Sequence, residues 1–260
     1  MEGPAEISIR PLCGMPLFAP GMSVAAEVLA AIARSGATLG DGDVVVLAQK
    51  IVSKAEGRLL RLADLAPAAE ARRMAAETAR EAEAVQAILD ESSDILRATP
   101  AAIIARHRTG HVLANAGIDA SNVEGGEDGT VLLWPVDPDA SARAIRAEIE
   151  RLAGVKPAVV IADSMGRAWR IGTVGTAIGC AGLTVLDDQR GVKQDLFGRT
   201  LQATVVAVAD SLCGTVSLAM GEGAEGTPAA IVGGAGRWVT AEDGPGAASG
   251  LRPLAEDMFR

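Results

Sequence analysis

Short apolar runs, separated by glycine, proline and charged residues, recur along this chain and predict both strands and helices. Residues 44–48 (Val-Val-Val-Leu-Ala) and 159–162 (Val-Val-Ile-Ala) are continuous apolar runs with the length of a buried strand, and residues 7–9 predict a shorter one. Apolar residues at helical spacing over residues 24–33 predict an amphipathic helix.

The middle of the chain predicts further helices and a hairpin. Residues 65–97 are rich in Ala, Glu and Arg with few helix breakers, which predicts a pair of surface helices. Residues 103–105 and 111–114 predict a hairpin around the turn at 108–110. A helix is predicted over residues 140–152 with Asp139 as its N-cap.

The last third of the chain is punctuated by glycine. Residues 166–191 and 221–237 are Gly-rich, whereas residues 201–210 predict the start of a buried helix. Strands and helices do not alternate strictly, so the pattern favours an α+β fold over a doubly wound sheet. The chain has no internal repeat and no long linker, which predicts one domain over residues 1–260 with room for two subdomains.

Composition and charge narrow the class of protein. The 260 residues carry a net charge of −9, and this acidity excludes general nucleic-acid binding, which needs a basic face. No apolar run approaches the roughly 20 residues needed to span a bilayer, so no membrane association is expected. The first six residues lack the cationic head and apolar middle of a signal peptide, which predicts a cytoplasmic protein.

The cysteine pattern indicates neither disulfides nor zinc. Cys13, Cys180 and Cys213 are an odd number, widely spaced and set among apolar residues. We expect all three to be buried free thiols.

Two short segments carry oxygen ligands next to predicted core elements. Asp119 and Asn122 lie in the polar turn of residues 114–122, and Asp163 and Ser164 follow the predicted strand 159–162. Carboxylate, amide and hydroxyl oxygens are the ligands that Mg²⁺ or Mn²⁺ prefers. An Asx turn that bonds its own backbone explains the first segment nearly as well. A strand-ending turn with exposed arginines explains the second.

Two further segments suit a phosphate-bearing ligand. Lys54 follows the strand 44–48 closely enough to meet a phosphate, although a solvated lysine is an equal alternative. Residues 220–228 (Met-Gly-Glu-Gly-Ala-Glu-Gly-Thr-Pro) resemble a loop whose backbone N–H groups approach an anion. This is not a Walker loop, because the terminal Gly-Lys-Ser/Thr is missing.

Other charged groups are weaker candidates. His107 and His111 have no obvious Ser or Cys nucleophile for a triad, and residues 106–108 (Arg-His-Arg) predict a small cationic patch. Arg199 follows Asp195 and either binds a carboxylate ligand or forms a surface ion pair.

Several of these motifs occur in the order found in one family. The segments 14–17, 53–58, 114–122, 163–170, 187–199 and 220–228 resemble the coenzyme F420-0:L-glutamate ligases, or gamma-glutamyl ligases, and the resemblance runs nearly end to end. It implies an enzyme that uses GTP to join L-glutamate by an amide bond to the deazaflavin precursor F420-0, through an acyl phosphate. It also implies Mg²⁺ or Mn²⁺, with K⁺ as a further ion.

The resemblance further implies a fold and an assembly. The expected fold is α+β, with mixed, largely antiparallel sheets, helices and two intertwined subdomains, working as a homodimer. The 49% hydrophobic content, with few aromatic residues, agrees with apolar surface buried between subunits.

Carried over residue by residue, the resemblance assigns a nucleotide site, a metal site and a catalytic set. The nucleotide is expected against Met15, Pro16, Leu17, Phe18, Gln49, Lys50, Lys54, Asn122, Met220, Gly221, Glu222, Gly223, Ala224, Glu225, Gly226 and Thr227. The metals are expected on Asp119, Asp163, Ser164 and Glu222, and the catalytic residues are Asp119, Asp163 and Lys54.

The sequence departs from the family pattern at two places. Ser164 replaces an expected threonine and keeps its hydroxyl, whereas the Gln49-Lys50 pair replaces small hydroxyl residues. Two alternatives remain open: a non-catalytic nucleotide- or deazaflavin-binding homologue, and an amide ligase of the same chemistry that acts on another acid.

Overall fold

A five-stranded sheet forms the centre of the computed structural model, which describes residues 6–257. Residues 1–5 lie outside this range, and so does most of the six-residue segment from which no signal peptide was predicted. The strand order is β1-β12-β2-β8-β9, and only β2 and β8 run parallel. The bounds are β1 Ser8–Pro11, β2 Val44–Ala48, β8 Ala158–Gly166, β9 Thr173–Ala181 and β12 Ala229–Gly233.

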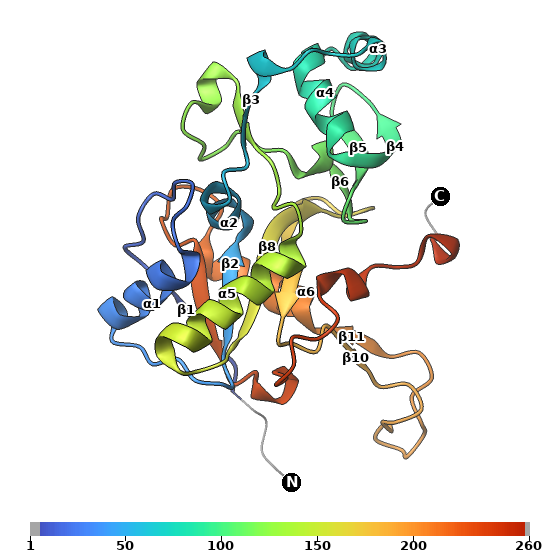
Figure 1. Cartoon of the computed structure of the whole chain (residues 1–260). Helices are drawn as coiled ribbons and strands as arrows, with labels where there is room; N and C mark the ends of the chain where they lie inside the picture. The colour runs from blue at the N-terminus through green and yellow to red at the C-terminus, as the bar shows by residue number, and fades with distance from the viewer. Residues whose placement is uncertain (1–5, 258–260) are drawn as a thin grey trace.

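Helices cover both faces of this sheet (Figure 1). Val45 and Leu47 of β2 pack with α1 (Val24–Ser35) and α5 (Pro138–Ala153), whereas Val44 and Val46 pack with α6 (Val208–Met220). Successive side chains of a strand point to opposite faces, so a continuous apolar run is required where both faces are buried. This explains the run of valines in β2, the strand that leads into the candidate site.

A smaller lobe has a hydrophobic cluster of its own (Figure 1). Its elements are α3 Ala69–Thr78, α4 Ala82–Asp90, β4 Ser92–Ala98, β5 Ile103–His107 and β6 Val112–Ala114. The two-stranded sheet of β3 (Leu59–Arg61) and β7 (Thr130–Leu132) lies where the chain enters and leaves this lobe.

A projecting arm and several short helices complete the fold. The arm consists of β10 (Leu186–Asp188), β11 (Val205–Ala207) and residues 189–204 between them (Figure 1). The remaining helices are α2 Gln49–Ala55 and the 3₁₀ helices η1 Leu62–Asp64, η2 Asn115–Gly117, η3 Gly126–Asp128, η4 Gly236–Trp238, η5 Ala247–Gly250 and η6 Leu254–Glu256. The fold is therefore mixed α+β with largely antiparallel sheets, as expected. Within residues 6–257, no helix has the length and apolar character needed to cross a membrane.

Two element predictions were wrong in part, and one strand was not predicted. The helix predicted to end at residue 97 ends at Asp90, and β4 follows because residues 92–98 pair with β5. The helix predicted from residue 201 begins at Val208, because residues 205–207 pair with β10. The Gly-rich stretch after residue 166 contains the long strand β9.

The N-cap of α5 is Asp137 and not Asp139. The first helical residue is Pro138, directly after Asp137, and the fixed φ of proline suits this position. The Asp137 carboxylate accepts from the Ala140 amide at 2.9 Å. Asp139 instead accepts from the amides of Cys180 at 2.8 Å and Ala247 at 2.7 Å. It therefore ties the start of α5 to β9 and to the C-terminal segment.

The expectation of buried thiols was correct for two of the three cysteines. Cys180 and Cys213 are buried, and burial raises the pKa of the Cys180 thiol to about 12. Cys13 is exposed in the loop that follows β1.

Candidate active site

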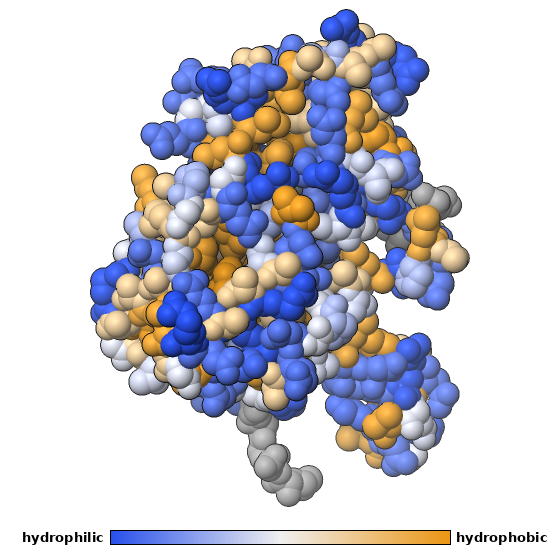
Figure 2. All heavy atoms as spheres, in the orientation of Figure 1, coloured by the Kyte–Doolittle hydropathy of each residue, from blue (hydrophilic) through white to orange (hydrophobic). Residues whose placement is uncertain are grey.

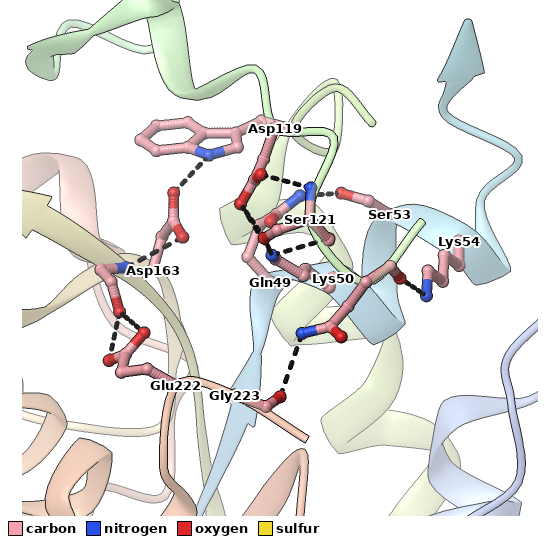
Figure 3. Close-up of polar contacts among 12 residues, drawn as sticks. Gln49, Lys50, Ser53, Lys54, Asp119, Ser121, Asp163, Glu222 and Gly223 are labelled. Carbon is pink, nitrogen blue, oxygen red and sulfur yellow. Dashed lines mark hydrogen bonds and ion pairs between the residues drawn. The ribbon is translucent and has the colours of Figure 1, made fainter. Parts of the chain in front are cut away.

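Lys50 and Asp119 form the centre of a polar cluster at the end of β2. Helix α2 begins directly after β2, so Lys50 lies in its first turn. The Lys50 ammonium donates to the Asp119 carboxylate at 2.7 Å and to the Ser121 carbonyl at 3.0 Å (Figure 3). Although partial burial opposes ionisation, the Lys50 ammonium and the Ser121 amide hold the pKa of Asp119 below its ordinary value. Asp119 is therefore an ionised carboxylate at neutral pH.

The turn that carries Asp119 is an Asx turn that also faces the cluster. The Asp119 side chain accepts from the Ser121 amide at 2.7 Å, and the Asp119 backbone pairs with Leu132. The structure thus confirms the Asx turn, and the metal-ligand interpretation of this segment stays a prediction. The preceding Gly117 has φ +73°, and a Cβ there would lie 2.4 Å from the Trp134 indole nitrogen. Only glycine lets this backbone pass so close to the ring.

Lys54 and Asn122 connect α2 to the glycine-rich loop. Lys54 lies one helical turn after Lys50, and its ammonium donates to the Asn122 carbonyl at 2.6 Å. The Asn122 side-chain amide donates to the Gly223 carbonyl at 3.1 Å (Figure 3). Burial, together with the nearby Lys50 charge, lowers the pKa of Lys54. Two cations from one helix face thus lie beside a glycine-rich loop.

Asp163 and Ser164 lie on β8, next to this cluster. The Asp163 carboxylate accepts from the Trp134 indole N–H at 2.8 Å and from the Ser164 amide at 2.9 Å. Burial raises the pKa of Asp163 to about 6 despite these two bonds, and the Asp119 charge acts in the same direction. The Ser164 hydroxyl lies 2.6 Å and 2.7 Å from the two carboxylate oxygens of Glu222 (Figure 3).

The loop of residues 220–227 holds the carboxylate of its own Glu225 against its backbone. The Glu225 carboxylate accepts from the Gly223 amide at 2.8 Å, and a Cβ on Gly221 would lie 2.3 Å from the Glu225 carboxyl carbon. Thr227 closes the loop by donating its hydroxyl to the Met220 carbonyl at 2.6 Å. The glycines therefore permit the close approach of a carboxylate, which is the geometry that a phosphate oxygen requires.

Two predicted nucleotide contacts are turned away from this cluster. The Gln49 side chain is 2% exposed, and its amide nitrogen donates to Ser53 and to the Leu133 carbonyl. In the segment of residues 15–18, Phe18 is buried in the main core, whereas Leu17 is 91% exposed. A nucleotide contact through these two buried side chains would need them to leave their packing, so backbone contacts are the simpler arrangement.

The oxygen donors fit a hard divalent cation in kind, but they are paired with other groups. Among residues 6–257, no three His, Cys, Asp or Glu side chains are grouped to hold one ion. Asp119 is paired with the Lys50 ammonium, and Glu222 with the Ser164 hydroxyl. Carboxylate and hydroxyl oxygens are the donors that Mg²⁺ and Mn²⁺ prefer, and Lys50 places one positive charge where such an ion would interact with Asp119. The metal assignment stays a prediction.

No motif in the sequence indicates the ionic cluster around Glu91, which lies beside Trp134. Glu91 is paired with Arg58 at 3.0 Å and with Arg108 at 2.6 Å, and the His107 ring nitrogen lies 3.5 Å away. Burial opposes ionisation of Glu91, but the His107, Arg58 and Arg108 contacts lower its pKa to about 2. In the sequence, Arg58 stood out only as part of the segment 53–58. Its partners Glu91 and Trp134 lie far away along the chain.

The predicted cationic patch at residues 106–108 was wrong. His107 is 2% exposed, Arg108 pairs with Glu91, and Arg106 pairs with Asp257 at 3.4 Å. Arg106 and Arg108 are paired with carboxylates that are largely buried, although the Arg108 side chain itself stays 52% exposed. Arg199 forms an ion pair with Asp195 at 2.6 Å, which agrees with the surface-pair alternative.

Comparisons with known proteins agree on one family. The family profile described as F420-0:Gamma-glutamyl ligase matches residues 14–234. The chain is similar to the coenzyme F420:L-glutamate ligase of Methanothermobacter thermautotrophicus, with 43% identity over 98% of this chain and 99% of that protein. Proteins of the same name from Archaeoglobus fulgidus and Haloarcula marismortui are 42% and 44% identical, over 87% and 84% of both chains respectively.

Proposed function

The chain belongs to the F420-0:gamma-glutamyl ligase family, and we propose that it joins L-glutamate to the deazaflavin precursor F420-0 by an amide bond, at the expense of GTP. The names of the relatives support ligation of glutamate to this coenzyme. GTP and the acyl phosphate come from the family resemblance together with the chemistry of the cluster around Lys50 and Asp119.

One observation carries the proposal. Hydrogen bonds join α2, the turn at Asp119, the end of β8 and the glycine-rich loop, although these segments are widely separated along the chain. The cluster presents two lysines, three carboxylates and a glycine-rich loop in which the Gly223 amide donates to the carboxylate of the loop's own Glu225. Such a set suits a nucleoside triphosphate and its charge-neutralising ions.

The reaction requires an activated carboxylate, because a carboxylate and an amine do not condense in water unaided. We propose that the terminal carboxylate of the F420-0 arm attacks the γ-phosphorus of GTP, which releases GDP and forms an acyl phosphate. The glutamate amine then attacks the acyl carbon, inorganic phosphate leaves, and the amine loses a proton. No bond to the protein forms in either step.

The chain's residues act by positioning and by electrostatics. Lys50 and Lys54 lie where their ammonium groups can pair with phosphate oxygens, and the glycine-rich loop can offer its backbone N–H groups. Asp119, Asp163, Ser164 and Glu222 would hold Mg²⁺ or Mn²⁺, which when bound screens charge on the transferred phosphoryl group, with K⁺ as a further candidate ion. Arg167 and Arg170 extend from the hairpin beyond Asp163 and are the candidates for carboxylates or the phosphodiester of the substrates.

The assembly is proposed to be a homodimer. The arm of residues 189–204 carries Val192, Leu196 and Phe197, which are 78%, 100% and 83% exposed. Figure 2 shows apolar atoms at the surface of this arm, at the lower right of the molecule. Large apolar side chains gathered on a projecting element favour burial against another chain.

The decisive experiment is incubation of the protein with GTP, L-glutamate, Mn²⁺ and F420-0, followed by mass analysis. A product heavier by one glutamyl residue, with one GDP and one phosphate released per product, is expected. GDP binding without product would favour the non-catalytic homologue. GTP-dependent glutamate ligation to a different acid, with F420-0 left unchanged, would favour the other amide ligase.

A further inference from the structure

We propose that Trp134 is a positioning residue for Asp163: its indole N–H holds the carboxylate in the orientation that a divalent cation meets. The inference rests on the proposed function, because Asp163 is there a metal ligand. Trp134 follows β7 and precedes α5, outside the segments that carry the family resemblance.

The contact leaves the carboxylate little freedom. The indole N–H donates to Oδ2 of Asp163 at 2.8 Å, and the Ser164 amide donates to Oδ1 at 2.9 Å (Figure 3). Each oxygen therefore has one donor, and rotation of the carboxylate would break both bonds. An indole is a donor only and carries no charge, so it orients the carboxylate without neutralising it. Hydrogen bonds of this kind tune how a ligand binds its metal.

The indole itself is held from several sides. Trp134 is fully buried, the His107 ring lies 4.8 Å from it at 50°, and the His111 ring lies 5.4 Å away edge-on at 81°. Gly117 passes so close that a Cβ would lie 2.4 Å from the indole nitrogen. A ring packed in this way keeps one rotamer, so the direction of its N–H is preset.

The small lobe supplies much of this support. Arg58 donates to the Trp134 carbonyl at 2.7 Å and also pairs with Glu91 at the end of α4. The Thr109 hydroxyl lies 2.9 Å from Nδ1 of both His107 and His111, which joins the two rings that flank the indole. Trp134 therefore links the buried cluster around Glu91 to the metal-facing carboxylate.

A matched pair of variants tests the N–H bond. Trp134→Phe keeps an aromatic ring but removes the N–H together with part of the indole. Trp238→Phe makes the same change at an indole that contacts the Asp187 carboxylate outside the cluster. Mn²⁺ binding is measured by calorimetry with GDP present. We expect Trp134→Phe to bind Mn²⁺ about tenfold more weakly, within the range for lost outer-shell partners of a metal ligand, and Trp238→Phe to bind as the wild type does.

Turnover provides a second comparison in the same variants. The Mn²⁺ concentration for half-maximal rate should rise in Trp134→Phe, whereas the KM for glutamate should stay within about twofold of the wild-type value. Equal Mn²⁺ affinity of wild type and Trp134→Phe would overturn the positioning role and leave the proposed function intact. A wild type that binds no divalent ion and forms no product would overturn both.

If Trp134→Phe does not fold, the proposal can be tested by NMR on the native Trp134 indole. The chain has three tryptophans, so ¹⁵N-indole labelling gives three N–H signals, and Trp169→Phe with Trp238→Phe leaves that of Trp134 alone. Saturation with Mg²⁺ and GDP should shift the Trp134 signal in the wild type and leave the Trp238 signal in place. An unchanged Trp134 signal under conditions where calorimetry shows Mg²⁺ bound would overturn the proposal.

Discussion

The ammonium of Lys50 lies 2.7 Å from a carboxylate oxygen of Asp119, 69 positions further along the chain. The side chains of Lys50 and Asp119 are 24% and 43% exposed, so the pair borders solvent and is open to exchange with a ligand. A divalent cation and the lysine would compete for the same carboxylate. A phosphate, in turn, would draw the lysine away from Asp119. Nucleotide and metal are therefore expected to bind cooperatively.

Lys50→Met should tighten Mn²⁺ binding in the absence of nucleotide and slow turnover. Removal of the ammonium frees the Asp119 carboxylate for the ion, and loss of a charged hydrogen bond of about 1.5 kcal/mol corresponds to roughly a tenfold change in affinity. Calorimetric titration with Mn²⁺ measures the effect, with Lys156→Met as the control because Lys156 pairs with Glu150 elsewhere on the surface. Weaker Mn²⁺ binding by Lys50→Met would show that the two cations do not compete.

Asp163→Asn should abolish turnover while the protein stays folded. Loss of one metal-binding charge is expected to cost on the order of a hundredfold or more in rate. The amide has nearly the volume of the carboxylate and keeps an oxygen for the Trp134 N–H, although the Ser164 amide loses its acceptor, so the protein should still fold. Product formation at saturating Mn²⁺ tests the loss of turnover, and the circular dichroism spectrum tests whether the variant is folded. Asp64→Asn, at an exposed carboxylate, is the control. Near-normal turnover would remove Asp163 from the site.

Lys54→Ala should weaken GDP binding much more than it raises the KM for glutamate. If the ammonium pairs with a phosphate, its loss costs roughly 1.5–3 kcal/mol, or about ten- to a hundredfold in affinity. GDP titration by calorimetry measures this directly. Equal affinities of wild type and variant would leave Lys54 as a support for the Asn122 carbonyl alone.

Glu91→Gln should destabilise the fold at neutral pH and matter less in acid. The pKa of Glu91 is lowered from 4.5 to about 2, so its carboxylate stabilises the folded state above pH 4.5, and this stabilisation is lost as the pH falls toward 2. The shift corresponds to about 3 kcal/mol at pH 7. Denaturant unfolding at pH 7 and at low pH compares the two conditions. If Glu91→Gln lowered the free energy of unfolding by the same amount at both pH values, the assignment would be contradicted. As a control, Glu150→Gln removes a carboxylate from an exposed pair and should cost under about 1 kcal/mol.

Light scattering at micromolar concentration should return a dimer. The exposed apolar residues of the arm predict that Leu196→Ser with Phe197→Ser weakens the assembly, because both side chains would lose buried apolar surface. A wild-type mass of 26.4 kDa at these concentrations would contradict the homodimer.

Local pattern was sufficient where an element is defined by its own residues. The apolar run of residues 44–48 became β2 with the same bounds, and helical spacing from residue 24 became α1, which Ser23 caps and Gly36 ends in a left-handed conformation. The α+β class followed from the order of such elements. These features depend on periodicity and capping, which are properties of neighbouring residues.

The resemblance of several segments to one family also indicated which residues to examine as a candidate site. Lys50, Lys54 and Asn122 were assigned to the nucleotide from their motifs, and the structure brings them together with Asp119 and Gly223. The same reasoning could not tell that Gln49 turns inward, because its direction depends on where Leu133 lies in the folded chain.

Only the tertiary structure decided which side chains are paired. The His107 ring is buried beside Glu91 and Trp134 rather than exposed in a cationic patch, and Trp134 points its N–H at Asp163. Each of these contacts joins residues from different elements, so its geometry is set by how those elements pack on one another. The sequence by itself determined the family and those elements that are defined by their own residues, such as β2 and α1. The folded chain determined the partners of each charge, because a buried charge or polar group must find its partner wherever packing places one.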